Sequence, residues 1–254
     1  MPEPAPAIHP FDLAHGVETS GLIPARELNT GHPHDAHITA YYGVAPSILR
    51  TLVEHWQATN PPHPIHEYTL IDYGAGKGRA MLVASELGFR RVLGIELNPD
   101  LATIAAQNIR LWTKAHASDP TAPALAPLEL LQQDALTVPL PEGPCVAFLF
   151  HPFEAPVLRK LLRHVETQIG RRGGSATAAL DVLYVNSECR AVLEKSPAFE
   201  RLFLGPVAMS PEDHAADLAA IATQQEYGST GDEECAIYRY TGRVFHGDLP
   251  GRLR

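Results

Sequence analysis

The stretch IDYGAGKGRA, residues 71–80, places an acid and three glycines at alternate positions: Asp72, Gly74, Gly76 and Gly78. Glycine permits backbone conformations and close approaches that a Cβ atom would prevent. An apolar run precedes the stretch and a helix-like run follows it, so the glycines would lie at the carboxyl end of a strand. Open α/β sheets bind ligands at that end of their strands. The stretch therefore predicts an α/β fold and the position of its ligand site.

The rest of the chain alternates between short apolar runs and runs of helical periodicity, which is typical of parallel βαβ units. The predicted strands are residues 68–73, 91–97, 128–134, 145–150, 179–186, 199–207 and 235–242. The predicted helices are residues 47–56, 78–88, 99–115, 155–169 and a short one within 209–228, and a Pro- and Ala-rich loop covers 113–127. A hairpin return would make the last two strands an antiparallel edge. We predict a Rossmann-like three-layer α/β sandwich with a seven-stranded, mostly parallel sheet and an antiparallel edge hairpin.

The chain length favours one main domain with an attached segment. A chain of 254 residues can bury one sizeable core, whereas a second full domain would leave too little chain for each. Residues 46–254 are predicted to form that domain. Residues 1–45 are rich in His, Pro and Gly. We expect them to form an N-terminal cap, or lid, over the ligand cleft.

Two other nucleotide-binding glycine motifs, the P-loop and the dinucleotide fingerprint, differ from this one. A P-loop needs G-x-x-x-x-G-K-[ST], but Gly78 follows Lys77 and no glycine stands five positions before Gly76. A dinucleotide fingerprint needs G-x-G-x-x-G, whereas the spacing here is G-x-G-x-G. Asp72 would also face the pyrophosphate of a dinucleotide, which is unfavourable. An NAD-dependent oxidoreductase remains an alternative.

Acids also follow the next two predicted strands. Glu96 ends the second strand, where a carboxylate can accept hydrogen bonds from both hydroxyls of a ribose. Asp134 ends the third. Each acid alone would be an ordinary strand end or loop cap. Their order at the ends of successive strands is what indicates a nucleoside site.

Residues 72–109 resemble class I S-adenosylmethionine (SAM)-dependent methyltransferases, whose first motif is D-x-G-x-G-x-G. The similarity extends over about residues 35–200 and is greatest to a bacterial group with the variant D-x-G-x-G-K-G-R. It implies SAM as the cofactor and methyl transfer to a nitrogen or oxygen nucleophile of a protein side chain or small molecule. It also implies contacts to the cofactor from Asp72, Gly74, Ala75, Gly76, Gly78 and Glu96, with Asp134 and Ala135 at the adenine and Tyr42, beside Tyr41 and Pro46, at the methionine end.

The residues at the end of the fourth strand read FLFHPF. In the family that the chain resembles, amine-methylating members often have Asn- or Asp-Pro-Pro-aromatic at this point, and the similar bacterial group has Asn-Pro-Phe. This chain has His151 instead of the amide or carboxylate. A neutral imidazole could orient or deprotonate a methyl acceptor, so His151 is the candidate catalytic residue. A loop histidine satisfied by backbone groups is the other interpretation. Phe153 could flank the ligand or belong to the core.

An alternative function for the whole protein also remains: it could be a partner subunit that binds the cofactor but does not catalyse methyl transfer.

The histidine-rich stretch GHPHDAH, residues 31–37, reads H-x-H-D-x-H, whereas metallohydrolase clusters read H-x-H-x-D-H. The sequence suggests no further ligand downstream of the stretch. We therefore predict no metal site. A polar lid over the cleft is the preferred interpretation.

The composition of the chain limits the classes of binding partner that we expect. The net charge of −9 disfavours nucleic acid, because such binding depends on Lys and Arg. The basic cluster Arg159, Lys160, Arg163, Arg171 and Arg172 is interpreted as a solvated helix face followed by a turn. The three cysteines form no C-x-x-C pair, and no secretory signal or membrane span is visible. A cytoplasmic protein without a membrane partner is expected, and the sequence indicates no oligomeric state.

Overall fold

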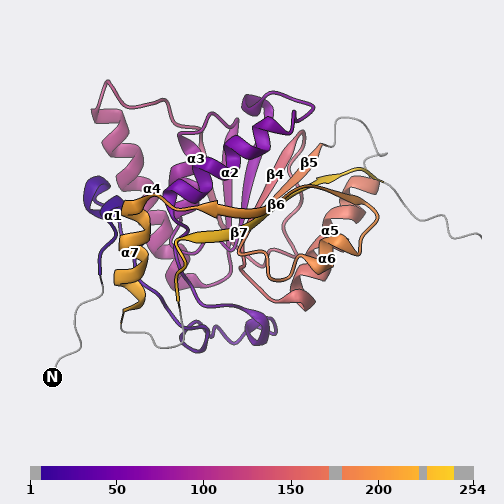
Figure 1. The fold of residues 1–254 in the computed structure, drawn as a ribbon, viewed down its shortest axis with the longest axis horizontal. Coiled ribbons are helices and arrows are strands. Elements are labelled where there is room, and N and C mark those ends of the chain that lie inside the picture. The colour runs from indigo at the N-terminus through magenta and orange to yellow at the C-terminus, as the bar shows by residue number, and fades with distance from the viewer. Residues whose placement is uncertain (1–6, 172–178, 223–227, 243–254) are drawn as a thin grey trace, which may run out of the picture.

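The computed structural model describes residues 7–171, 179–222 and 228–242 (Figure 1). The strands are β1 (Thr69–Tyr73), β2 (Arg91–Glu96), β3 (Leu128–Gln132), β4 (Cys145–Phe150), β5 (Leu180–Val185), β6 (Phe199–Ala208) and β7 (Asp232–Tyr240). The helices are α1 (Pro10–His15), α2 (Pro46–Ala58), α3 (Arg79–Ser85), α4 (Pro99–Ser118), α5 (Ala155–Arg171), α6 (Ala191–Glu194) and α7 (Pro211–Ile221). Three 3₁₀ helices are η1 (Ala25–Glu27), η2 (Asp35–His37) and η3 (Ile65–Glu67).

The strands form one seven-stranded sheet in the order β3-β2-β1-β4-β5-β7-β6. Strands β1 to β5 pair in parallel, and β7 is antiparallel to both β5 and β6. The predicted fold class is confirmed, including the antiparallel edge. The two antiparallel strands, β6 at the edge and β7 next to it, are separated in the chain by α7.

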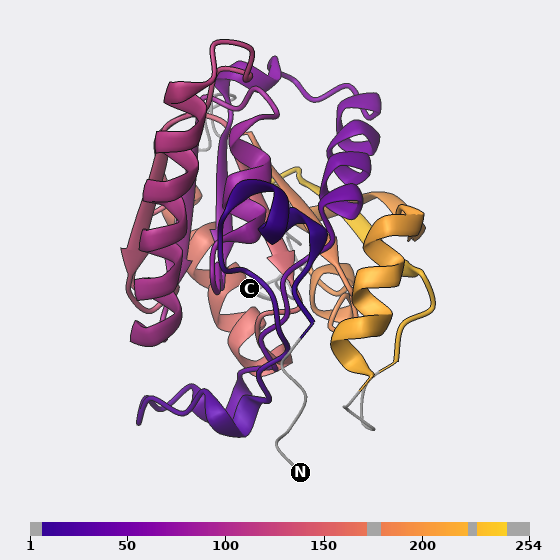
Figure 2. The same cartoon turned by 90° about the vertical axis from the view of Figure 1, so that its left-hand side faces the viewer.

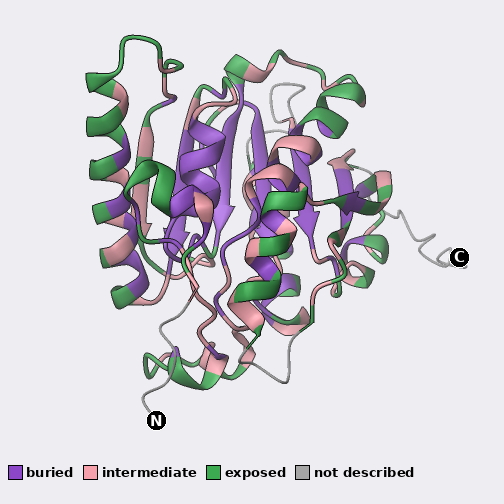
Figure 3. Ribbon diagram, turned by 60° about the vertical axis from the view of Figure 1, so that its left-hand side comes forward, coloured by how far each residue is buried: buried purple, intermediate pink, exposed green. Residues whose placement is uncertain are grey.

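The sheet is a buried middle layer (Figure 3). Alternate strand residues face opposite sides, so Leu70 and Val146 pack with α2 and α3, while Ile71 and Ala147 pack with α5. All residues of β1 and β5 are buried. Strands covered on both faces read as continuous apolar runs, which is why the sequence located them well.

Two element boundaries differ from the prediction. Helix α4 continues to Ser118, so the first residues of the predicted loop are helical. Trp112 is fully buried and His116 contacts Glu86, and these contacts hold the last turns of α4 against the domain. The short helix α6 was not predicted. The end of the last predicted helix, residues 223–227, lies outside the described residues.

The N-terminal segment lies at the carboxyl ends of the parallel strands. In Figures 1 and 2 the indigo chain between α1 and α2 descends past the sheet and returns beside it. It pairs with itself at Ile23 and Tyr41, and with the loop after β4 at Ile38 and Phe153. The segment thereby lies over the carboxyl ends of the strands, where the predicted site residues lie.

The exposed face of α5 and the apolar character of the helices bear on the expected binding partners. The predicted basic helix face is exposed at Arg159, Lys160 and Arg163, while Arg172 lies outside the described residues. Within residues 7–171, 179–222 and 228–242, none of the helices combines the length and apolar character that a membrane span requires.

Candidate functional site

A cavity of about 130 Å³ opens between the strand ends and the N-terminal segment. One side, here called the sheet wall, consists of residues at the ends of β1 to β4. The opposite side, here called the N-terminal wall, consists of cavity-lining residues between Leu28 and Val44. The sequence-predicted residues that line the cavity are Asp72, Gly74, Ala75, Gly76, Glu96, Asp134, Ala135 and Tyr42. The structure therefore brings these residues together, although they come from four separate stretches of chain.

Asp72 is the most unusual group of the sheet wall. Its side chain is buried, and its Oδ2 atom has no hydrogen-bond partner. Burial, together with the nearby charge of Glu96, raises the pKa of the Asp72 carboxyl to about 8. A buried polar atom without a partner is costly and needs an explanation. An ionised Asp72 would be stabilised by a positively charged ligand in the cavity.

Glu96 is buried beside it but is well held. Its Oε2 accepts from the backbone N–H of Gly76 at 2.7 Å, and its Oε1 accepts from that of Asn98 at 2.8 Å. Burial raises the pKa of Glu96, while these backbone donors oppose the shift. The carboxylate is thus fixed against the glycine loop, with lone pairs left to accept from a ligand hydroxyl.

The three glycines have different neighbours. Gly74 and Gly76 have positive φ angles, and a Cβ atom on either would collide with Pro152 or Tyr41, respectively. Gly78 does not line the cavity; it begins α3 and packs against Ala105. The alternate spacing therefore serves the packing of the loop as well as access to the cavity.

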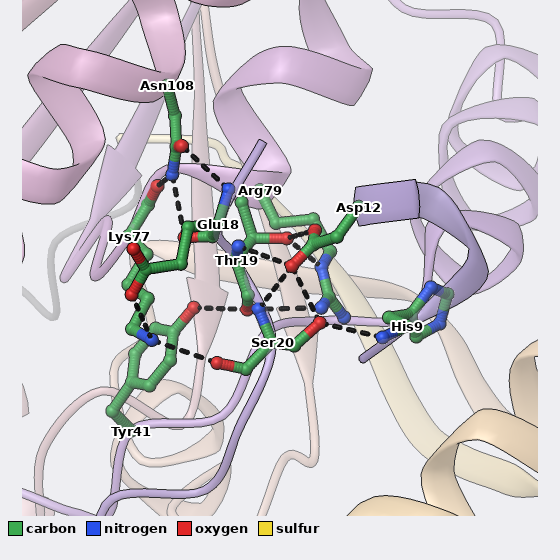
Figure 4. A network of polar contacts seen from close by, with 9 residues as sticks. All are labelled: His9, Asp12, Glu18, Thr19, Ser20, Tyr41, Lys77, Arg79 and Asn108. Atoms are coloured by element: carbon green, nitrogen blue, oxygen red, sulfur yellow. Dashed lines mark hydrogen bonds and ion pairs between the residues drawn. The ribbon is translucent and has the colours of Figure 1, made fainter. Parts of the chain in front are cut away.

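Arg79, the arginine of the glycine loop, lies at the edge of the cavity and holds the N-terminal segment (Figure 4). Its guanidinium is buried and donates to Thr19 Oγ1 at 2.7 Å, to Thr19 O at 3.0 Å and to Gly43 O at 3.0 Å. Asp12 accepts from the Thr19 backbone and hydroxyl, which fixes that residue in turn. A Cβ atom at position 43 would lie 2.8 Å from the guanidinium carbon, so a larger residue there would displace the guanidinium from its hydrogen bonds.

Lys77 adds a second attachment in the same network. Its Nζ donates to Ser20 O at 2.9 Å and lies 5.5 Å from the centre of the Tyr41 ring. The Tyr41 hydroxyl donates to Thr19 O at 2.7 Å. Asn108 of α4 donates to the carbonyls of Glu18 and Lys77. Arg79 therefore joins the glycine loop to the N-terminal wall at Gly43, and Lys77 and Arg79 also hold the preceding residues Thr19 and Ser20. The sequence pattern did not reveal these contacts.

Asp134 lies where the loop after β3 meets the histidine-rich stretch. Its Oδ1 accepts from the N–H of Leu136, and its Oδ2 lies 3.4 Å from His34 Nδ1 and 3.8 Å from His32 Nε2. The sequence did not connect this acid with these histidines. A contact from Asp134 to an adenine amino group stays a prediction.

His151 lies next to the cavity, but its ring is not part of the lining. The ring stacks on Tyr184 at 6.5 Å, with Nδ1 3.2 Å from the Tyr184 hydroxyl and Nε2 3.6 Å from Glu188. Burial lowers the pKa of His151, with Glu188 and Glu154 opposing the shift, so the imidazole is neutral near pH 7. Its φ of 40° is in the left-handed region, and its carbonyl accepts from Thr39. The catalytic role of His151 stays a prediction.

Phe150 and Pro152 were identified as lining residues only in the structure. Phe153, for which the sequence left ligand contact and core packing open, lines the cavity and also belongs to the core packed on α5. Burial raises the pKa of the Tyr42 phenol, and Asp217 raises it further. Pro46, grouped with Tyr42 by the resemblance, is not in the lining; it begins α2.

Comparison of the sequence with protein-family models and with curated proteins finds no match. Solved structures with a similar fold include protein 1320 of Thermoplasma acidophilum, with 12% identity over 89% of this chain and 91% of that one and a TM-score of 0.46. Magnesium protoporphyrin IX methyltransferase of Synechocystis PCC 6803, solved with bound SAM, has 11% identity over 76% and 79% of the two chains and a TM-score of 0.45. Ribosomal protein L11 methylase of Lactobacillus delbrueckii subsp. bulgaricus has 14% identity over 76% and 77%, with a TM-score of 0.44. At this level of similarity the comparison concerns the fold alone.

Proposed function

We propose that the protein is a SAM-dependent methyltransferase that transfers a methyl group to a nitrogen or oxygen nucleophile. The observation that carries the proposal is the buried Asp72 carboxyl, whose Oδ2 has no partner in a cavity at the end of β1. The D-x-G-x-G-K-G-R pattern at the same point supports the same ligand.

The charge of the sheet wall distinguishes between the nucleotide classes. A dinucleotide would bring its negatively charged pyrophosphate against the glycine loop, next to the buried carboxyls of Asp72 and Glu96. Like charges in a buried site repel strongly, since the local dielectric is low. SAM has an adenosine without phosphates and an amino-acid tail with an ammonium and a sulfonium group. The donors and acceptors of the sheet wall therefore fit SAM better than NAD.

Each wall residue has a role in this proposal. Asp72 receives the ammonium group of the amino-acid tail, and Glu96 accepts from the ribose hydroxyls while its bonds to Gly76 and Asn98 keep it oriented. Asp134 and Ala135 border the adenine, and Tyr42 lies at the methionine end, where an aromatic face attracts a cation. Gly74, Ala75 and Gly76 allow close approach of the loop, with Gly78 supporting it from behind.

The bound cofactor would supply a methyl group made electrophilic by the positive sulfur. The protein then has to bring an acceptor into line, exclude water and take up the proton that the nucleophile loses. Phe150, Pro152 and Phe153 form the apolar part of the lining near the reaction. His151, neutral at pH 7, is proposed to orient the acceptor or to take up its proton. The net charge of −9 supports a protein side chain or small molecule over nucleic acid as the acceptor.

The direct test is transfer of labelled methyl from SAM to fractionated proteins and metabolites from cells, after calorimetry with S-adenosylhomocysteine and, separately, NADH. The proposal predicts S-adenosylhomocysteine binding, no NADH binding, and label in one fraction that depends on the protein. Binding of NADH without S-adenosylhomocysteine would contradict it.

A cofactor-binding partner subunit without catalysis is the second candidate. It is favoured by one observation, the orientation of the His151 ring toward Tyr184 and Glu188 instead of into the cavity. Under this alternative the protein would bind S-adenosylhomocysteine, but no fraction would receive label from the protein alone. Label that appears only when a second protein is added would identify this case.

A further inference from the structure

The histidine-rich stretch and the loop after β3 bring three metal-binding side chains together. His32 Nε2, His34 Nδ1 and Asp134 Oδ2 all lie within 4.8 Å of one another. Ligand atoms of a tetrahedral zinc site are about 3.3 Å apart, given metal–ligand bonds of about 2.0–2.2 Å. The two distances from Asp134 Oδ2 are 3.4 and 3.8 Å, so small side-chain movements would complete the geometry.

The His34 nitrogen is the second observation that indicates a ligand. His34 Nδ1 is buried and has no hydrogen-bond partner, although Asp134 Oδ2 is only 3.4 Å away. The two atoms are close but do not have the alignment of a hydrogen bond. Such an arrangement is expected when both atoms face a common third atom, as metal ligands do.

Surrounding contacts hold the cluster in place. Asp134 keeps one oxygen bonded to the N–H of Leu136, which turns the other toward the histidines. Asp35 accepts from the N–H groups of Thr30 and His32, which fixes the loop that carries both imidazoles. Fixed ligands and oriented carboxylates are typical of metal sites.

The protonation of His32 sets the cost of binding. His32 Nδ1 accepts from the N–H of His34 at 3.2 Å, so in this arrangement its proton is on Nε2, which faces Asp134. A metal on Nε2 requires the other tautomer of His32 and the loss of that long hydrogen bond. A metal on His34 Nδ1 likewise requires the proton to move to Nε2, with loss of the 3.5 Å contact from Lys160 Nζ to that nitrogen. Two metal–nitrogen bonds and one metal–oxygen bond would replace these contacts.

We propose that His32, His34 and Asp134 bind one zinc-class transition-metal ion at the edge of the cavity. Two imidazoles and one carboxylate favour Zn²⁺, Co²⁺ or Ni²⁺, whereas Mg²⁺ and Ca²⁺ prefer oxygen ligands throughout. Three protein ligands leave a fourth position open. Because His34 and Asp134 both line the cavity, the ion would fasten the N-terminal wall to the sheet wall beside the ligand. The site does not depend on the proposed methyltransferase function.

The test uses untagged, chelator-treated full-length protein, titrated with Zn²⁺ in competition with a chromophoric chelator, and with Co²⁺ monitored by visible absorption. The proposal predicts one Zn²⁺ per chain, a visible spectrum of four-coordinate Co²⁺, and no comparable binding of Mg²⁺. His34→Ala and Asp134→Asn should each weaken Zn²⁺ binding about 100-fold or more, since loss of supporting contacts alone costs 10–100-fold.

His37→Ala is the matched control, because His37 belongs to the same stretch but contacts Glu154. It should bind Zn²⁺ as tightly as the wild type. Thermal unfolding without metal identifies any cluster variant that fails to fold. The variant His34→Gln is then used in place of the one that failed. Zn²⁺ should raise the melting temperature of the wild type but not of Asp134→Asn. Absence of stoichiometric Zn²⁺ binding, or binding unchanged in both cluster variants, would overturn the proposal; the two imidazoles would then serve only as neighbours of the Asp134 carboxylate.

Discussion

The sheet wall and the N-terminal wall of the cavity obtain their polar groups in different ways. Asp72 and Glu96 stand at the ends of adjacent parallel strands, so the fold alone brings them together. The N-terminal wall has no sheet of its own. Arg79 attaches it through the Gly43 carbonyl, and Lys77 and Arg79 hold the preceding chain through the carbonyls of Ser20 and Thr19. One short motif thus serves both sides of the cavity: its acid and first glycines line the sheet wall, while its Lys and Arg hold the N-terminal segment.

The largest expected effect is at Asp72. Asp72→Asn keeps the shape but removes the charge, so we expect S-adenosylhomocysteine affinity to fall about 100-fold, or about 2.7 kcal/mol. Calorimetry at pH 8 measures the change. Asp100→Asn, an exposed acid at the start of α4, is the control and should bind normally. Equal affinities for the two variants would mean that Asp72 does not face the ligand.

The ionisation of Asp72 also makes the stability of the folded protein depend on pH. Its pKa is about 8 in the folded protein and lies near 3.8 when unfolded, so the folded state binds the proton more tightly. The stability that this group contributes is complete below about pH 4 and is lost as the pH rises to about 8. Urea unfolding should therefore show that Asp72→Asn is more stable than the wild type at pH 8, on the order of 5 kcal/mol, with a smaller gain of about 2 kcal/mol at pH 5. A gain that does not depend on pH would contradict this explanation.

Next in size is the attachment of the N-terminal wall. Arg79→Met removes three hydrogen-bond donors, so the carbonyls of Thr19 and Gly43 lose their bonds to the guanidinium. We therefore expect the free energy of unfolding to fall by about 2 kcal/mol. For a chain of this length the melting temperature should fall by roughly 4–8 °C. Arg159→Met on the exposed face of α5 should leave it unchanged. If Arg79→Met melts like Arg159→Met, the two walls are not joined by this residue.

Glu96→Gln should have a smaller effect. A glutamine can accept from Gly76 or Asn98 with its oxygen, but its NH₂ group would face the other N–H donor. We expect about tenfold weaker S-adenosylhomocysteine binding, or about 1.4 kcal/mol. Calorimetry checks this, and 2′-deoxy analogues of the ligand should lose less affinity in Glu96→Gln than in the wild type. An equal loss would separate Glu96 from the ribose.

The smallest expected effect on binding is at His151. Its ring is outside the cavity lining, so His151→Ala should change S-adenosylhomocysteine affinity less than about twofold. If the imidazole orients the acceptor, methyl transfer should nevertheless fall by about 100-fold. Weak ligand binding in this variant would contradict the separation of the two tasks.

The sequence predicted the fold and the sheet wall because both depend on local patterns. Strands such as β4 and β5 are buried on both faces and read as apolar runs, and Asp72 and Glu96 directly follow apolar runs of this kind. Parallel pairing then places their ends side by side without further information. The resemblance implied a cofactor contact from Gly78, whereas in the structure Gly78 is not in the cavity lining and its neighbour is Ala105 of α4.

The N-terminal wall could not be predicted in the same way. Arg79 meets Thr19 and Gly43 across 60 and 36 residues of chain, and no periodicity indicates such a contact. The approach of Asp134 to His32 and His34 likewise depends on where an irregular segment returns to the sheet. The orientation of His151 follows from its left-handed backbone, an unusual conformation for a residue other than glycine.

The most direct test of the central claim is the number of protons released when S-adenosylhomocysteine binds. At pH 7 the Asp72 carboxyl is mostly protonated, and a ligand ammonium beside it should ionise it. Calorimetry in buffers of different ionisation enthalpy should therefore show release of about one proton by the wild type, and none by Asp72→Asn. Binding with no proton release by the wild type, or equal release by both proteins, would contradict a buried Asp72 that receives a cation.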